Sequence, residues 1–248
     1  MHGTGGGGPL RLQHAFSVAK WEDASNEDCW SVAPDGLSCA LSDGASVSYD
    51  SAPWAAILVR RFVECPEVTQ AWIEEASKEY RSRYDRAAMP WMHQAAFDRG
   101  SHATLLGLAY SNEADSANVF AIGDSLLALL DSGELVLSFP YTSMEEFDRS
   151  PVLLSTNSRE NRSLDDQASV LALDLTERAN PAILLMSDAL GRWLLQEGEP
   201  ARASMLLSIE DEETFRELVE TERSSGGLRR DDTTLLVLTC RHESSPDY

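Results

Sequence analysis

The sequence predicts an α+β fold. Strand-like runs follow one another in groups, and amphipathic helices occur in sets between these groups, rather than in the strict alternation of a parallel α/β fold. The chain has 248 residues, 43% of them hydrophobic and 25% charged, which is ordinary for a globular protein with a substantial core. With no internal repeat or linker in view, we expect one domain over residues 10–241, between a disordered Gly-rich tail at 1–9 and a polar tail at 242–248.

The first strands are predicted near the N-terminus. Residues 10–19 place apolar side chains at alternate positions, which is typical of a strand with one buried face. Residues 29–32 and 37–42 also alternate, and the turn sequence Pro34-Asp35-Gly36 lies between them. These two runs are therefore expected to form a hairpin.

Helices are predicted over the next part of the chain. Residues 50–53 supply a possible cap and a proline suited to a first turn, and apolar residues at helical spacing continue to 62. A second helix repeats apolar residues every four positions over 68–84, and a shorter one is expected over 91–99. The arginines and lysine of this part are interpreted as a solvated helix face rather than as a binding patch.

The second half of the chain is predicted to contain a group of strands, then short helices and a last strand. Strands are expected at 103–110, 118–122, 126–130 and 134–139, the last three as a meander, and again at 169–175, 182–187 and 233–239. The polar stretch 140–166 is predicted to be irregular, and it is a candidate mobile segment near the functional site. Short helices are expected at 190–195 and 201–207, and a longer one begins at a capping-box-like sequence at Ser208.

Acidic residues stand at one end of five strand-like runs. They are Glu27-Asp28, Asp43, Asp124, Asp188 and Asp231-Asp232. Each has an alternative interpretation as a turn residue, since strand-Asp-Gly alone is more typical of a hairpin turn than of a site. If these strand ends share one rim, the carboxylates form a cluster that needs cations between them. Ligands that are all oxygen favour Mg²⁺ or Mn²⁺ over Zn²⁺, and two such ions can hydrolyse a phosphate ester.

The order of these motifs resembles that of the metal-dependent type 2C protein serine/threonine phosphatases, in the compact form typical of bacterial members. The matching sequences are Asn26-Glu27-Asp28, Ser42-Asp43-Gly44, SHAT at 101–104, Gly123-Asp124-Ser125, Ser187-Asp188 and Asp231-Asp232-Thr233-Thr234. The resemblance spans about residues 16–239. It implies a four-layer α/β/β/α sandwich, in which two antiparallel sheets are flanked by helices and the metals lie at one end.

The resemblance also implies roles for the acidic residues. Asp43 is expected to bridge two Mn²⁺ or Mg²⁺ ions, the Gly44 carbonyl to complete the shell of the first ion, and Asp188 and Asp231 to bind the second. Glu27 and Asp28 are expected to order the waters bound to the metals, either by direct contact or through hydrogen bonds to the groups that hold them. Asp124 is either a tight-turn residue or a metal ligand. The implied activity is hydrolysis of phosphoserine or phosphothreonine by a metal-activated water, without a covalent enzyme intermediate.

Several positions depart from the family pattern. The usual phosphate-binding arginine before the Glu-Asp motif is absent, and Lys20 is a candidate replacement as a point charge. Ala45 stands where many members have a histidine that can serve as a general acid. Arg192 replaces an acidic residue that often binds a third metal, so a third ion is not supported, and Arg192 is either the missing phosphate cation or an ion-paired surface residue. These departures leave a second hypothesis, a catalytically weak or inactive homologue that binds a phosphoprotein or regulates a kinase.

Charge and cysteine content limit the partners. The formal net charge of −21 argues against nucleic acid and anionic membranes. The expected partner is a phosphorylated protein, such as a cognate serine/threonine kinase or one of its targets. The four cysteines have no metal-ligand spacing, and no apolar run is typical of a signal peptide or a membrane span, so we expect a cytoplasmic location.

Overall fold

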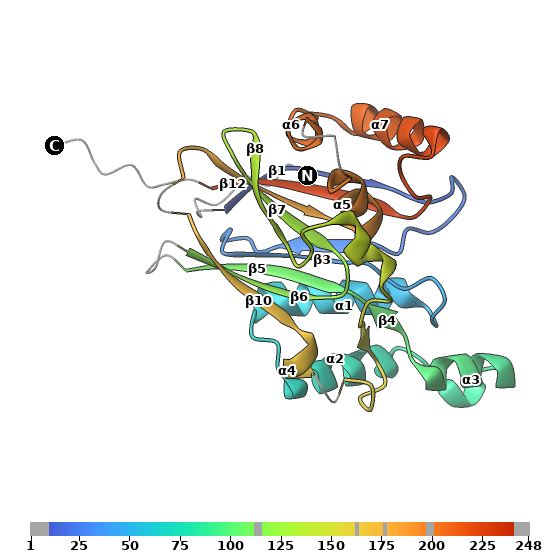
Figure 1. Ribbon diagram of the computed structural model, residues 1–248. Coiled ribbons are helices and arrows are strands. Elements are labelled where there is room, and N and C mark those ends of the chain that lie inside the picture. The colour runs from blue at the N-terminus through green and yellow to red at the C-terminus, as the bar shows by residue number, and fades with distance from the viewer. Residues whose placement is uncertain (1–9, 112–115, 162–163, 176–177, 197–200, 241–248) are drawn as a thin grey trace.

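The fold is a sandwich of two stacked antiparallel sheets with helices on both outer faces (Figure 1). The structure is a computed structural model that describes residues 10–111, 116–161, 164–175, 178–196 and 201–240. The tails expected at 1–9 and 242–248 lie outside these ranges. The four-layer α/β/β/α architecture implied by the resemblance is confirmed.

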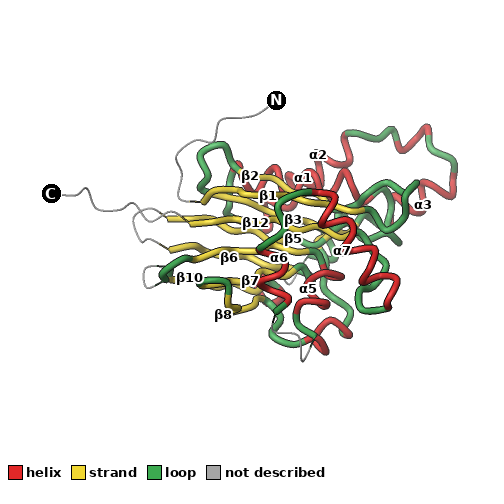
Figure 2. Tube along the Cα trace, turned by 90° about the horizontal axis from the view of Figure 1, so that it is seen from above, coloured by secondary structure: helices red, strands yellow, loops and turns green. Residues whose placement is uncertain are grey.

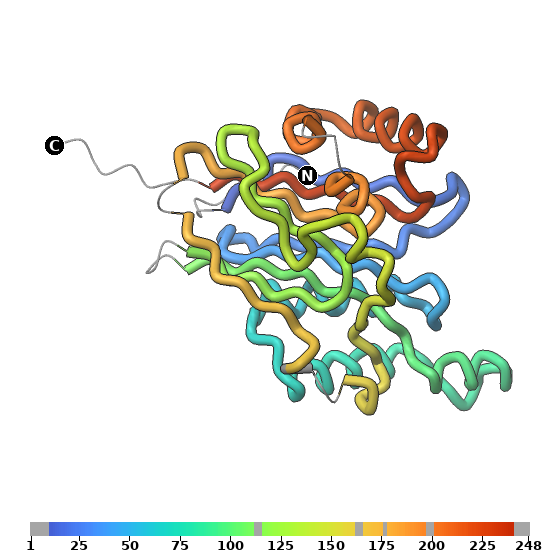
Figure 3. Tube along the Cα trace, in the orientation of Figure 1, coloured from blue at the N-terminus to red at the C-terminus, as the bar shows by residue number. Residues whose placement is uncertain are grey.

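Sheet A contains the first and last strands of the chain. Its order is β1-β12-β11-β7-β8, and its strands are β1 (Leu10–Val18), β12 (Thr233–Cys240), β11 (Pro181–Met186), β7 (Leu126–Asp131) and β8 (Glu134–Phe139). β1 and β12 lie side by side and antiparallel, as the chain trace in Figure 3 shows. The two ends of the sequence are thus joined by a strand ladder, and this pairing closes the domain.

Sheet B carries the predicted hairpin at one edge. Its order is β10-β6-β5-β3-β2, and its strands are β10 (Ser169–Asp174), β6 (Ser116–Ile122), β5 (Leu105–Ser111), β3 (Ser38–Ser42) and β2 (Cys29–Val32). β2 and β3 pair antiparallel, as expected. A small separate ladder joins β4 (His102–Ala103) to β9 (Leu154–Ser155). Seen from above in Figure 2, the strands of the two large sheets run in similar directions.

The meander predicted over 118–139 is wrong in its first half. β6 pairs with β5 and β10, whereas β7 pairs with β11 and β8, so the two strands belong to different sheets. The turn at residues 123–125 carries the chain from one sheet to the other, and Gly123 adopts a φ of 99° there. Alternating hydrophobicity identifies a strand, but it does not specify which strand is its neighbour.

Strands in the middle of each sheet are buried on both faces, which explains their continuous apolar sequences. In β7, Leu127 and Leu129 pack between the sheets, while Leu126 and Leu130 pack against the helices that cover sheet A. β11 and β12 divide their side chains in the same way. The domain therefore has one core between its sheets and a further core under each helical layer.

The helices complete these outer layers. Sheet A is covered by α5 (Asp188–Leu194), α6 (Arg202–Leu207) and α7 (Glu212–Ser225). α1 (Ser51–Glu64) packs on sheet B, α2 (Gln70–Ser82) packs on α1, and α3 (Trp91–Arg99) projects beyond them in Figure 1. The remaining short helices are η1 (Arg86–Ala88), η2 (Met144–Asp148) and α4 (Leu164–Gln167). Among the described residues, no helix is both long and apolar enough to cross a bilayer.

Two local predictions in the helical layers need correction. The stretch 140–166 is not wholly irregular, since it contains η2, β9 and the start of α4. Ser208 does not begin the last long helix but ends α6, and α7 is capped by Asp211, whose side chain accepts a hydrogen bond from Thr214 N at 2.8 Å. Ile209 is buried in the core between these helices, and this contact fixes where the chain turns.

Gly107 of β5 allows α1 to approach sheet B closely. A Cβ atom at position 107 would lie 2.2 Å from the ring of Phe62, which is itself buried. We expect Gly107→Ala to lower the free energy of unfolding by about 1–3 kcal/mol, because a full core cannot accept the methyl group. Urea denaturation measures this loss, and Phe62→Leu in the same chain should recover part of it. Equal stability of Gly107→Ala and the wild type would contradict the close contact.

Candidate metal centre

The strand register brings five acidic positions to one rim of the sandwich. In sheet B, the end of β3 pairs with the start of β2, and the start of β5 pairs with the end of β6. In sheet A, the end of β11 pairs with the start of β7 and lies near the start of β12. The turn at 123–125 joins β6 to β7 at this same end. The residues just beyond these strand ends are Asp28, Asp43, Asp124, Asp188 and Asp231.

Asp43 is held at the middle of this rim by its backbone. Its N–H donates to Thr104 Oγ1 at 2.8 Å, and its carbonyl oxygen accepts from Thr104 N at 2.9 Å. Thr104 Oγ1 also lies 2.8 Å from Ser125 Oγ, which links Asp43 to the turn that carries Asp124. Burial raises the pKa of Asp43 well above its usual range, and the carboxylates of Asp28, Asp188, Asp124 and Asp231 raise it further.

Asp28 presents an unsatisfied oxygen at the rim. Thr234 Oγ1 donates to Asp28 Oδ2 at 2.6 Å, whereas Asp28 Oδ1 is buried and has no hydrogen-bond partner among the residues that the structure describes. Burial raises the pKa of Asp28 to about 7. A buried carboxylate oxygen without a donor is costly, and a cation or an ordered water would satisfy it.

Glu27 is held by hydrogen bonds from three side chains. Lys20 Nζ lies 3.1 Å from Glu27 Oε2, Ser51 Oγ donates to Oε1 at 2.5 Å, and Ser46 Oγ donates to Oε2. Burial disfavours the charged form, but these hydrogen bonds outweigh it and lower the pKa of Glu27. Both carboxylate oxygens are thus engaged, which favours a positioning role over direct metal ligation. The same contacts hold the ammonium group of Lys20 against Glu27.

Asp188 and Asp231 contact a cation that the sequence analysis missed. The Arg229 guanidinium lies 3.6 Å from Asp188 Oδ2 and 3.8 Å from Asp231 Oδ2. Burial raises the pKa of Asp188, while the charge of Arg229 opposes this shift. Arg229 lies in the loop before β12, which has no periodic pattern. Only its position two residues before Asp231 could have drawn attention to it.

Asp124 and Arg192 are the two residues for which the sequence left two interpretations open, and each has features of both. Asp124 lies in a tight turn, yet its pKa is raised to about 7 by burial and then by Asp188, so it also faces the cluster. Arg192 forms an ion pair with Asp148 of η2 at 3.1 Å, which agrees with the ion-paired alternative. Its charge also opposes the rise in the pKa of Asp188 that burial causes.

The donor set fits Mg²⁺ or Mn²⁺. Within the described ranges, no three carboxylate, imidazole or thiol side chains converge closely enough to enclose an ion by themselves. An ion of this kind does not require such a cage, because Mg²⁺ keeps several waters and takes only one or two carboxylates. The acidic side chains here offer oxygen only, and one buried oxygen of Asp28 has no partner within the described ranges. Burial raises the pKa values of Asp28, Asp43, Asp124 and Asp188. These are the properties of carboxylates arranged for a hard cation.

The fold is that of the type 2C serine/threonine phosphatases. The catalytic domain of the serine/threonine protein phosphatase PstP, solved with 2 manganese ions, is 18% identical with a TM-score of 0.63, over 94% of this chain and 99% of that one. PppA, a key regulatory component of T6SS in Pseudomonas aeruginosa, is 20% identical with a TM-score of 0.62, over 94% and 98%. The serine/threonine phosphatase Stp1 from Staphylococcus aureus is 15% identical with a TM-score of 0.61, over 98% and 99%. By sequence, no family model and no curated protein matches the chain.

Arg229 is expected to weaken metal binding at the rim. Its positive charge contacts two of the predicted metal ligands, so a divalent ion must displace or tolerate it. Because the guanidinium is more than half exposed, we expect Arg229→Gln to tighten Mn²⁺ binding by only about two- to fivefold. Isothermal titration calorimetry measures this directly, with Arg216→Gln on the surface of α7 as the control. Weaker Mn²⁺ binding in Arg229→Gln would contradict the prediction.

Proposed function

We propose that this protein is a phosphatase that hydrolyses phosphoserine or phosphothreonine and depends on Mn²⁺ or Mg²⁺. One observation carries the proposal: a phosphatase fold places five buried or half-buried acidic residues at a single rim, in the order that the sequence motifs predict. The proposed substrate is a phosphorylated protein, such as a cognate serine/threonine kinase or one of its targets.

The proposed site divides its residues by role. Asp43 and the Gly44 carbonyl would hold the first of two ions, and Asp43, Asp188 and Asp231 would hold the second. When bound, these ions supply a water of lowered pKa and the positive charge that phosphoryl oxygens require. Asp28 Oδ1, which has no donor among the described residues, is available to accept a hydrogen bond from an ordered water, and Glu27 stays fixed by Lys20, Ser46 and Ser51. Thr104 fixes the backbone of Asp43 through two hydrogen bonds.

Hydrolysis of an aryl phosphate and of a phosphothreonine peptide tests the proposal. Each is measured with Mn²⁺, with Mg²⁺ and with EDTA. The expected result is turnover with either metal and none with EDTA. Turnover that persists in EDTA, or a complete absence of turnover with metal demonstrably bound, would contradict it.

A catalytically weak or inactive homologue is the second candidate, and a contact in the structure favours it. Lys20, the candidate replacement for the missing arginine, has its ammonium group bound to Glu27 and Ser46 rather than free to meet a phosphate. Ala45 also offers no proton donor. This candidate predicts Mn²⁺ binding by calorimetry together with tight binding of phosphopeptides and no turnover.

A further inference from the structure

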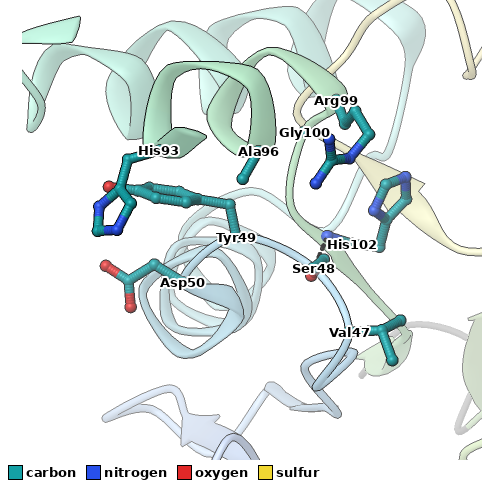
Figure 4. Close-up of a pocket in the computed structure, with 9 residues that line it drawn as sticks. All are labelled: Val47, Ser48, Tyr49, Asp50, His93, Ala96, Arg99, Gly100 and His102. Carbon is teal, nitrogen blue, oxygen red and sulfur yellow. Dashed lines mark hydrogen bonds between the residues drawn. The ribbon is translucent and has the colours of Figure 1, made fainter. Parts of the chain in front are cut away.

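A pocket of about 420 Å³ lies next to the candidate metal centre. Its walls are the loop at 47–50, the face of α3 that carries His93, Ala96 and Arg99, and the segment from Gly100 to His102 of β4 (Figure 4). The pocket takes no part in the proposed chemistry.

The pocket is joined to the metal centre by short connections. Ala45 N, two residues after Asp43, donates to the His102 carbonyl oxygen at 2.9 Å. Val47 at the pocket wall is fully exposed and only four residues from Asp43. Since consecutive Cα atoms are 3.8 Å apart, the Val47 side of the pocket lies within about 15 Å of Asp43. An extended peptide spans that distance in about four or five residues.

The walls of the pocket are held rigidly. Phe97 of α3 is buried against Tyr49, Tyr80 and Tyr84. Arg86 donates two hydrogen bonds to the Asp98 carboxylate, at 2.7 and 2.5 Å, which ties α3 to the short helix before it. A site built on packed elements keeps its shape without a ligand and loses little entropy on binding.

One end of the pocket carries an uncompensated positive charge. Arg99 is exposed and makes no hydrogen bond or ion pair with any residue that the structure describes. The neighbouring His102 is already engaged, since its Nε2 lies 2.7 Å from Glu160 Oε2. Asp50, the acidic residue of the pocket, lies at the opposite end beside His93 and accepts a hydrogen bond from Tyr84. In a chain with a net charge of −21, an unpaired arginine facing a pocket beside the site is a favourable place for an anionic group.

We propose that this pocket binds an acidic side chain, Asp or Glu, of the phosphoprotein substrate, with the carboxylate on Arg99 and the aliphatic part against Tyr49 and Ala96. The proposal rests on the proposed function, because it deepens the choice of substrate. The pocket thus selects phosphorylated segments with an acidic residue about four positions from the phosphorylated one.

The test compares phosphothreonine peptides that carry Asp, Asn or Lys four residues on either side of the phosphothreonine. At low salt, the wild type is expected to prefer Asp over Asn by about two- to fivefold in kcat/KM, and about 0.5 M NaCl should remove this preference. Arg99→Glu is expected to reverse the order, so that the Lys peptide becomes the best substrate. Arg216→Glu on α7 makes the same change in net charge far along the sequence and should keep the wild-type order. Ala96→Trp, which fills the pocket without changing charge, should abolish the preference.

Binding of phosphonate analogues of these peptides, followed by fluorescence anisotropy, gives the same ranking without turnover. A protein that hydrolyses no aryl phosphate would count against the proposed function, while the anisotropy ranking still tests the pocket. The same ranking in Arg99→Glu as in the wild type would overturn the pocket proposal. So would a wild type that responds to a second phosphoserine in the peptide but does not distinguish Asp from Asn.

Discussion

Replacing Asp43 with asparagine is expected to reduce metal-dependent hydrolysis by at least about 10³-fold while the protein stays folded. The loss follows because Asp43 is the residue proposed to contact both ions, and asparagine supplies neither the charge nor the second anionic oxygen. The metal-free variant is also expected to be more stable than the metal-free wild type. Burial and four neighbouring carboxylates raise the pKa of Asp43, so its charge opposes folding when no cation is present.

Kinetic assays with an aryl phosphate and thermal unfolding in EDTA measure the two effects. Asp131→Asn is the matched control, since Asp131 lies at the opposite end of β7 and its pKa is lowered by backbone hydrogen bonds from Asn180 and Ala179. The control should keep activity and lose a little stability, the reverse of the Asp43 variant. Full activity in Asp43→Asn would contradict the two-metal proposal.

The second large effect is that bound metal reverses the pH dependence of folding stability. Burial raises the pKa values of Asp28 and Asp124 from 3.8 to about 7, so the metal-free folded state binds protons that the unfolded state has already released. The stability that Asp28 and Asp124 contribute to the metal-free protein is therefore fully present below about pH 4 and is lost as the pH rises to 7. Since one pKa unit corresponds to about 1.4 kcal/mol, the loss is on the order of a few kcal/mol.

Added Mn²⁺ is expected to remove or invert this slope. The metal binds the ionised carboxylates, so its affinity increases with pH and it stabilises the folded state most where the metal-free protein is weakest. Unfolding temperatures between pH 5 and 8, in EDTA and in excess Mn²⁺, give the two slopes. In this range the carboxylates with lowered pKa values, such as Glu27, are ionised in both states and contribute no slope. Parallel slopes in the two buffers would show that the acidic cluster does not bind the metal.

Much of the fold could be predicted from the sequence because its signals are local. Short apolar runs such as 182–187 and 233–239 were predicted as strands. They lie in the middle of a sheet and are buried on both faces, which explains why they lack polar positions. The order of the acidic motifs also indicated a phosphatase fold, which the structural neighbours confirm. The roles of the individual acidic residues remain predictions.

Other features depended on partners that the sequence does not reveal. Leu126 and Ile122 are close in the chain yet lie in different sheets, because pairing is decided by the total arrangement of strands rather than by local alternation. The N-cap of α7 is Asp211 rather than Ser208 for a similar reason. Both residues are suitable N-caps by local sequence, and Ile209, which lies between them, is buried in the core.

The sequence by itself determined the strands, the helices and the identity of the acidic groups, because hydrophobic period and residue chemistry belong to the chain. Tertiary structure alone decided how these groups interact. It brought Arg229 to Asp188 and Asp231. In the part of the chain that the structure describes, it also left one oxygen of Asp28 without a partner and Arg99 facing a pocket without a counter-ion. Electrostatic interactions depend on distance and burial, and both of these are set only when remote segments pack together.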